Sequence, residues 1–121
     1  MPTTETVLFA EENRACPLLK WLDGLPAKAQ DKCIVRIERL TAMGHDLRRP
    51  EADFLRDGIY ELRVTLQGVQ YRMFYFFHES RAVLTHGLIK RQREVPPREI
   101  DLATACRAQY EKDPLKRTHK G

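Results

Sequence analysis

The sequence is poor in cysteine and tryptophan and has no long hydrophobic run. Its 121 residues include three cysteines, one tryptophan and no apolar stretch long enough to cross a bilayer. Cys16, Cys33 and Cys106 lie far apart, without the Cys-x-x-Cys or Cys/His patterns of a zinc site. We therefore expect buried, reduced thiols rather than disulfides or metal ligands. Because the first residues lack the basic start and apolar stretch of a signal peptide, we expect a cytoplasmic protein.

Other signatures of specific chemistry are missing as well. The sequence contains no glycine-rich phosphate-binding loop, no pair of histidines at metal-ligand spacing and no paired-carboxylate motif. It also has no internal repeat and no low-complexity segment. We therefore expect a protein that uses neither a metal nor another cofactor.

Charge of one sign is only slightly in excess. The chain has 21 basic and 17 acidic residues, a net charge of +4 and a pI of about 9.1. Residues 48–98 hold 10 of the basic residues, whereas residues 1–47 hold six. The placement of the surplus therefore matters more than its size. The length and a composition of 42% hydrophobic and 31% charged residues predict one soluble globular domain.

The hydrophobic pattern changes from helical spacing to strand alternation along the chain. The expected elements are a strand over 6–10, helices over 17–24 and 26–43, strands over 59–66, 69–77 and 82–90, and a helix over 100–111. Residues 45–57 are expected to form a polar connector. This order predicts an α+β fold with an antiparallel sheet, a helical pair before it and a C-terminal helix after it. We place the domain over residues 1–112 and a loose basic tail over 113–121.

The hairpin around Gln67-Gly68 gives the sharpest prediction. A two-residue turn there pairs Leu66 with Val69 and places Arg63 directly opposite Arg72. Alternate residues of the two strands then form one apolar face, made of Tyr60, Leu62, Val64, Leu66, Val69, Tyr71, Met73, Tyr75 and Phe77. Because like charges opposite each other repel, we expect a negative group between the arginines. Two candidates remain open, an internal carboxylate such as that of Glu61 and the phosphate of a ligand.

A second basic cluster follows at the end of the last expected strand. Lys90, Arg91 and Arg93 are expected to project over the same polar face as the arginine pair. The face on which His86 lies depends on the length of the preceding turn, which leaves both faces open. Phe74 and Phe76 share the parity of Arg72, and we favour burial under the helical pair or the C-terminal helix over base stacking for them.

Four segments of the sequence together carry a recognisable pattern. They are GIYELR at 58–63, GVQYRMFY at 68–75, HGLIKR at 86–91, and Pro96-Pro97 followed by a helix. The combination resembles the HigB-like, phage-derived branch of the RelE/ParE toxin superfamily, over residues 6–112. The resemblance implies a RelE-like fold and the toxin of a type II toxin–antitoxin system. It also implies a partner antitoxin, which in the HigB branch is typically a helix-turn-helix protein.

The same resemblance implies a chemistry and a set of site residues. Toxins of this kind cut messenger RNA on the ribosome without a metal, by attack of the RNA 2′-hydroxyl on the adjacent phosphate. The basic catalytic positions of the family fall on Arg63, Arg72 and Lys90. We expect RNA contacts from Arg91, Arg93 and His86. Some relatives add a C-terminal tyrosine or histidine, for which this sequence offers only Tyr110, at an unmatched position.

Two alternative functions share the scaffold that the resemblance implies. One is a ParE-like inhibitor of DNA gyrase, which acts by binding rather than by cleavage. The other is an inactive toxin homologue that serves as a binding module. The predicted pair of opposed arginines favours RNA cleavage over gyrase inhibition.

Overall fold

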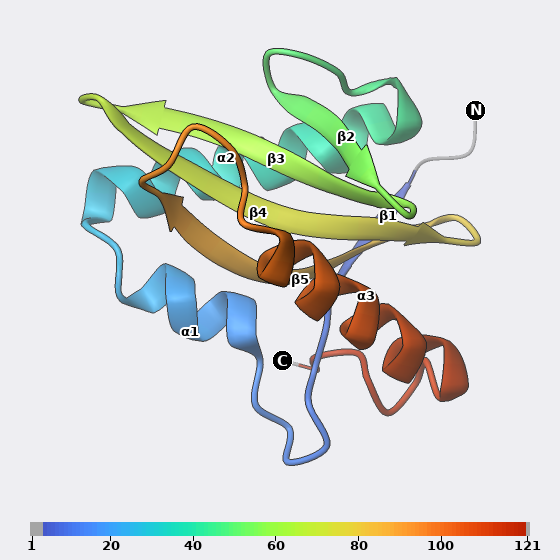
Figure 1. The fold of residues 1–121 in the computed structure, drawn as a ribbon. Coiled ribbons are helices and arrows are strands. Elements are labelled where there is room, and N and C mark those ends of the chain that lie inside the picture. The colour runs from blue at the N-terminus through green and yellow to red at the C-terminus, as the bar shows by residue number, and fades with distance from the viewer. Residues whose placement is uncertain (1–3, 121) are drawn as a thin grey trace.

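The chain folds around one five-stranded sheet in the computed structural model, which describes residues 4–120 (Figure 1). The elements are β1 (Glu5–Leu8), α1 (Pro17–Asp23), α2 (Ala27–Met43), the short 3-10 helix η1 (Gly44–Asp46), β2 (Ala52–Arg56), β3 (Ile59–Leu66), β4 (Val69–His78), β5 (Arg81–Lys90) and α3 (Pro97–Lys112). The strand order is β1-β5-β4-β3-β2, with β1 parallel to β5 and the other pairs antiparallel. The predicted α+β fold is confirmed, but the sheet is mixed and not wholly antiparallel, because β1 runs parallel to β5.

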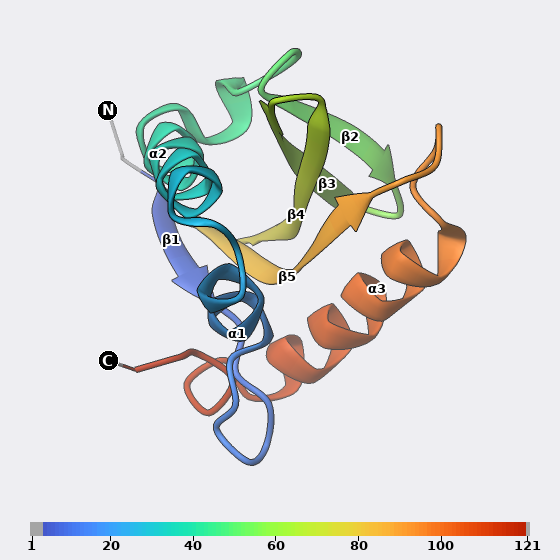
Figure 2. The same ribbon diagram turned by 90° about the vertical axis from the view of Figure 1, so that its left-hand side faces the viewer.

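The helices lie on opposite sides of the sheet. Figure 2 shows α1 and α2 on one side and α3 on the other. The predicted apolar face of the β3–β4 hairpin packs under α1 and α2, where Leu62, Met73 and Tyr75 are almost completely buried together with Leu18 and Leu40 of the helices. This face supplies the larger of the two hydrophobic clusters and, with it, most of the apolar burial that stabilises the fold.

The second cluster lies under α3 and covers only part of the opposite face. Phe74 and Phe76 of β4 are completely buried there against Ile100, Ala103 and Tyr110 of the helix. This result confirms the predicted burial and shows that, of the two elements left open, the C-terminal helix covers both phenylalanines. The remainder of this face, toward the ends of β3 and β4 at residues 66 and 69, carries charged side chains instead.

The predicted register of the β3–β4 hairpin is confirmed. Leu66 pairs with Val69 and Arg63 with Arg72. The turn residues Gln67 and Gly68 have φ values of 52° and 80°, as a two-residue hairpin turn of this hand requires. The two arginines therefore lie side by side on the face opposite the α1–α2 core.

One strand appears where the sequence pattern predicted a connector. Residues 52–56 form β2, which pairs with β3 at the edge of the sheet. The connecting turn is Asp57-Gly58, with φ values of 54° and 78°. Asp-Gly is a strong signal for such a turn, and reading it would have identified the strand.

The ends of the domain also differ from expectation. Helix α3 begins at Pro97, three residues before the predicted start. Proline is favoured at the first helical position, because the backbone N–H that it lacks would have no partner within the helix there. The tail is less loose than predicted, since Ala10 N–H donates to the Arg117 carbonyl and His119 N–H to the Leu8 carbonyl, both at 2.7 Å. The predicted domain and tail also include residues 1–3 and 121, which lie outside the described residues. Within residues 4–120, no helix combines the length and the apolar character needed to cross a membrane.

Candidate active site on the polar half of the sheet

The charged half of the sheet forms the floor of an open pocket of about 380 Å³. Its polar lining comes from the β2 region, from β3, from the end of β5 and from the segment after it. The lining residues are Arg49, Asp53, Phe54, Leu55, Arg56, Glu61, Arg63, Lys90, Arg93, Glu94, Val95 and Ile100. The pocket therefore brings together three of the basic residues that the sequence singled out, Arg63, Lys90 and Arg93.

Glu61 lies between the two opposed arginines. The Nε atom of Arg72 is 3.1 Å from Glu61 Oε1, and the Nε atom of Arg63 is 3.9 Å from Glu61 Oε2. The Arg72 and Glu61 atoms are within ion-pair distance but are poorly aligned for a hydrogen bond. Of the two negative groups that the sequence left open, the structure thus shows the internal carboxylate.

The two arginines differ sharply in exposure. Arg72 is only 1% exposed, and one of its Nη atoms donates to the Tyr71 carbonyl at 3.1 Å. The side chain of Arg63 is 31% exposed and faces the pocket. Arg63 is therefore placed to touch a ligand directly, whereas Arg72 lies beneath the pocket floor and is paired with Glu61.

Burial dominates the electrostatics of this cluster. It raises the pKa of Glu61, against the attraction of the Arg72 and Arg63 guanidinium groups. It also lowers the pKa of the Lys90 ammonium, and the positive charges of Arg72 and Arg63 lower it further, with Glu61 opposing them. A lysine whose ammonium loses its proton more readily is better suited to proton transfer than an ordinary surface lysine.

The remaining predicted site residues are distributed unevenly. Lys90 lies on the same face as Arg72, because it pairs with Gln70, and Arg93 follows it at the rim of the pocket. Arg91 is exposed and does not line the pocket. Among residues 4–120, none of these three bases forms an ion pair. The segment 90–93 therefore presents positive charge that no neighbouring acid neutralises.

His86 lies on the α3 side of the sheet but is buried beneath that helix. Its Nε2 atom is 3.1 Å from Glu99 Oε1, its Nδ1 atom is 2.9 Å from the Thr85 hydroxyl, and its ring contacts Phe74. At 7% exposure it does not face the pocket, so it is positioned to fix the start of α3 rather than to meet RNA. Tyr110 is also fully buried, at the far end of α3, where its hydroxyl accepts from Arg81 at 3.4 Å.

The sequence did not point to the wall that β2 and its flanking residues contribute. Arg49 donates two hydrogen bonds to Asp53, at 2.7 and 2.9 Å, and Arg56 pairs with Asp57 and Asp101. These pairs neutralise the basic side chains on that side of the pocket. The unpaired positive charge of the pocket is therefore on Lys90 and Arg93, while Arg63 shares the single carboxylate of Glu61 with Arg72.

The pocket is suited to an anion that carries hydrogen-bond acceptors on several sides. An arginine can hold two phosphate oxygens at once, and an ammonium beside it can stabilise added charge or transfer a proton. Within the described residues 4–120, His, Cys, Asp and Glu side chains nowhere form a group of three or more that could hold a metal ion.

Comparison with known protein families gives a match over most of the chain. Residues 20–107, more than two thirds of the chain, match the model of a family described as phage derived protein Gp49-like (DUF891). The matched span contains α2, the β2–β5 meander and most of α3, and hence every residue of the pocket. No curated protein matches the sequence. The chain therefore belongs to the Gp49-like family of phage-derived proteins, which is a RelE-type, toxin-like family.

Proposed function

We propose that this protein is the toxin of a type II toxin–antitoxin pair and that it cleaves messenger RNA on the ribosome. One observation carries the proposal: Arg63 and Lys90 face a concave pocket on one sheet face, above the buried Glu61–Arg72 pair. Membership of the toxin-like family supports the toxin role. The presence of Arg63, Lys90 and Arg93 together in one hollow supports a single phosphate as the target.

The proposed reaction is a transesterification that needs only the RNA and these side chains. The 2′-oxygen of one nucleotide forms a bond to the adjacent phosphorus, and the bond from phosphorus to the next 5′-oxygen breaks. The 2′-hydroxyl gives up a proton and the leaving 5′-oxygen takes one, so the products are a 2′,3′-cyclic phosphate and a 5′-hydroxyl. The protein contributes orientation and stabilisation of the charge that builds up on the phosphate oxygens.

Each residue of the cluster then has a distinct role. Arg63 binds the non-bridging oxygens of the phosphate with its planar guanidinium group. Lys90 transfers a proton to or from the reacting oxygen atoms of the RNA, and its lowered pKa favours that transfer. Arg72 does not reach the RNA in this arrangement, and it acts as a positioning residue that holds Glu61 and adds positive charge below the phosphate. Arg91 and Arg93 contact the RNA backbone on either side.

The partners in this proposal are those that the family resemblance implies. The protein acts in the cytoplasm, on messenger RNA held by the ribosome, and a cognate antitoxin, a helix-turn-helix protein in our proposal, neutralises it. The reaction as written requires no metal ion, because Arg63 and Lys90 supply the positive charge.

Translation of a defined message on purified ribosomes tests the proposal. Primer extension should show breaks at in-frame positions when the intact chain is added. Arg63→Ala should reduce the cleavage rate by about 10²-fold or more, the size of effect expected when one donor to a developing oxyanion is removed. Lys28→Ala, at an exposed base at the start of α2, is the matched control and should leave the rate unchanged.

Two results would contradict the proposal. Equal cleavage rates for Arg63→Ala and the intact chain would show that the pocket is not the site of cleavage. Growth arrest that persists in Arg63→Ala together with loss of DNA supercoiling would instead identify a gyrase inhibitor.

A further inference from the structure

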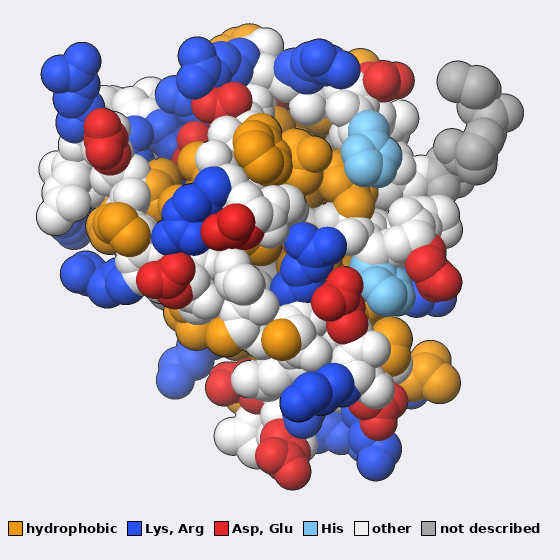
Figure 3. Space-filling view, turned by 45° about the vertical axis from the view of Figure 1, so that its right-hand side comes forward, with side chains coloured by type: hydrophobic (Ala, Val, Ile, Leu, Met, Phe, Trp, Pro, Cys, Tyr) orange, Lys and Arg blue, Asp and Glu red, His pale blue; other side chains and the backbone are white. Residues whose placement is uncertain are grey.

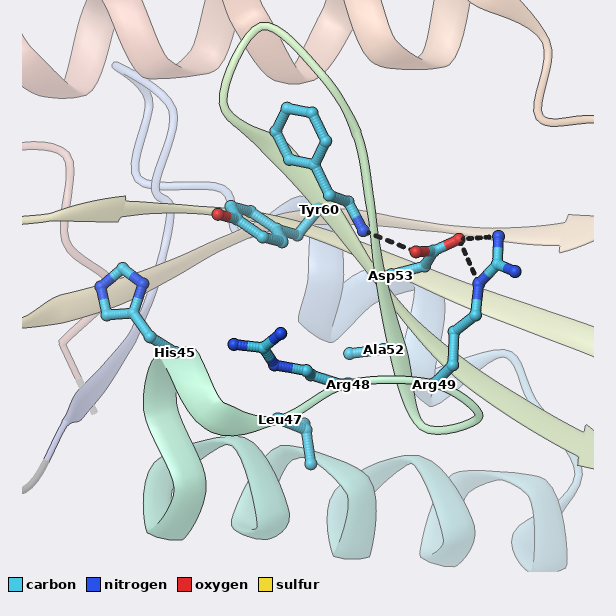
Figure 4. Close-up of a pocket in the computed structure, with 8 residues that line it drawn as sticks. His45, Leu47, Arg48, Arg49, Ala52, Asp53 and Tyr60 are labelled. Carbon is cyan, nitrogen blue, oxygen red and sulfur yellow. Dashed lines mark hydrogen bonds and ion pairs between the residues drawn. The ribbon is translucent and has the colours of Figure 1, made fainter.

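A second pocket lies on the other side of the edge strand β2. It has a volume of about 470 Å³ and is formed by η1, the loop after it, β2 and the start of β3. The lining residues are His45, Leu47, Arg48, Arg49, Ala52, Asp53, Phe54 and Tyr60 (Figure 4). This volume is in the range of sites that bind small organic molecules.

Aromatic rings form one wall of this pocket and extend behind it. The ring of Tyr60 stacks on Tyr75, with centroids 5.3 Å apart, and meets Phe54 edge to face at 5.1 Å. The His45 ring stacks on Phe77 at 3.6 Å. His45 is exposed and Phe54 is 53% exposed, so these rings are held in place from behind while remaining open to solvent. Figure 3 shows exposed hydrophobic side chains beside a histidine on this side of the molecule.

Arg48 supplies a positive charge that has no counter-charge. Within residues 4–120, its guanidinium group forms neither an ion pair nor a side-chain hydrogen bond, although it is exposed and several acids lie nearby in the sequence. Figure 4 shows this group lying below the ring of Tyr60 and directed toward the side of the pocket where His45 lies. The neighbouring Arg49, in contrast, is neutralised by Asp53.

The two pockets lie on either side of the edge strand β2 and share part of their lining. Arg49, Asp53 and Phe54 line both the aromatic pocket and the basic pocket that contains Arg63 and Lys90. Asp53 pairs with Glu61 and Phe54 with Tyr60, so successive residues of β2 point to the two faces of the sheet. A flexible chain that occupies the basic pocket can therefore continue over this edge into the aromatic pocket.

We propose that the aromatic pocket binds one nucleotide of the RNA substrate, outside the site of cleavage. Its base stacks on the rings of His45 and Tyr60, and its phosphate pairs with Arg48. Stacking on aromatic side chains together with a nearby arginine is how proteins hold single-stranded RNA. The assignment of the ligand as part of the RNA substrate rests on the function proposed above.

A nucleotide fits this pocket better than an apolar protein segment does. A hydrophobic peptide would leave the Arg48 guanidinium covered and without a counter-charge, at a cost in free energy. The phosphate of a nucleotide supplies that charge. The same pocket also offers flat ring faces, which suit a planar base more than they suit aliphatic side chains.

Titration of the full chain with each of the four ribonucleoside 5′-monophosphates, followed by NMR, tests the proposal without any cleavage. The amide signals of residues 45–60 should shift on titration. Arg48→Ala and His45→Ala should each weaken binding about tenfold, an effect typical of losing one charge-assisted contact or one stacking partner. Both side chains are exposed, so the variants should fold, and Lys28→Ala should bind like the intact chain. Arg63→Ala should still bind at the aromatic pocket.

The outcomes separate this proposal from the function on which it rests. Nucleotide binding that depends on Arg48 supports the pocket even if the protein cuts no RNA. RNA cleavage accompanied by shifts confined to the residues around Arg63 and Lys90 would overturn the pocket and leave the cleavage intact. Absence of nucleotide binding, with Arg48→Ala weakening the antitoxin complex instead, would also overturn it, in favour of a protein partner.

Discussion

The two faces of the β3–β4 hairpin are built from alternate residues of the same strands, yet they do different things. On one face, Leu62, Met73 and Tyr75 are buried under α1 and α2 in a continuous apolar layer. On the other face, the apolar layer under α3 ends at Phe74, and Arg72, two residues earlier on the same strand, begins the charged cluster. The change from apolar to charged therefore occurs within one strand.

This difference shows how a small domain separates stability from function. The face under α1 and α2 buries apolar area without interruption, and this burial is the main stabilising contribution. The opposite face is only partly covered, so it can carry a buried ion pair and an open basic pocket. The charged half depends on Glu61, because without this carboxylate two arginines would face each other with no negative charge between them.

Removal of Glu61 should have the largest effect on stability. Glu61→Leu leaves the Arg72 guanidinium buried and unpaired, and we expect the free energy of unfolding in urea to fall by about 3–5 kcal/mol. The double variant Glu61→Leu/Arg72→Met removes both charges and should recover much of this loss. Asp53→Asn breaks the solvent-screened pair with Arg49 and serves as the control, with a far smaller change.

The opposite pattern would alter the comparison of the two faces. If Glu61→Leu left the free energy of unfolding unchanged, the Arg72 guanidinium would have to reach water or another partner by a local rearrangement of the pocket floor. The charged half would then be a loosely packed surface. If the double variant were no more stable than the single one, the loss would come from the fit of the side chains and not from the unpaired charge.

A substitution at Gly87 of β5 tests the packing of the opposite face, under α1 and α2. A Cβ atom at this position would collide with the six-membered ring of Trp21, which lies on the sheet there. Gly87→Ala should therefore lower the free energy of unfolding by about 1–3 kcal/mol, as overpacking of a filled core does. In a Trp21→Leu background the same substitution should cost much less. Equal losses in both backgrounds would show that the strand itself, and not the contact with Trp21, requires glycine.

The sequence was most informative where period-two alternation coincided with a well-defined turn. The Gln67-Gly68 turn set the register, and the register placed Arg63 opposite Arg72. Strand β2 was missed because Ala52–Arg56 is short and has a mixed pattern, and its register shifts after Phe54. Only the Asp57-Gly58 turn indicated it, and the wall that it adds to both pockets was missed with it.

The placement of His86 could not be predicted from the sequence. The pairing of β4 with β5 shifts between Met73 and Tyr75, which pair with Gly87 and Leu84. Such a shift changes which residues of β5 share a face with β4, and no residue type announces it. The burial of Arg72 was equally hidden, because alternation gives the face of a residue but not what covers it.

His86 provides the smallest of the three effects and probes the boundary between the apolar and charged halves. Burial lowers the pKa of its imidazole below the ordinary value of 6.5, although the carboxylate of Glu99 opposes this. Below pH 6.5 the unfolded chain therefore binds a proton at this histidine that the folded chain does not. The free energy of unfolding should therefore decrease as the pH is lowered. Glu61 has the opposite influence, because a raised carboxyl pKa makes stability fall as pH rises.

The measurement is thus the difference between the intact chain and His86→Gln in urea unfolding, at pH values from about 7.5 down to 5. The intact chain should lose more stability on acidification than the variant does. A larger loss in the variant would mean that Glu99 holds a charged imidazolium and that this ion pair fastens the start of α3 to the sheet.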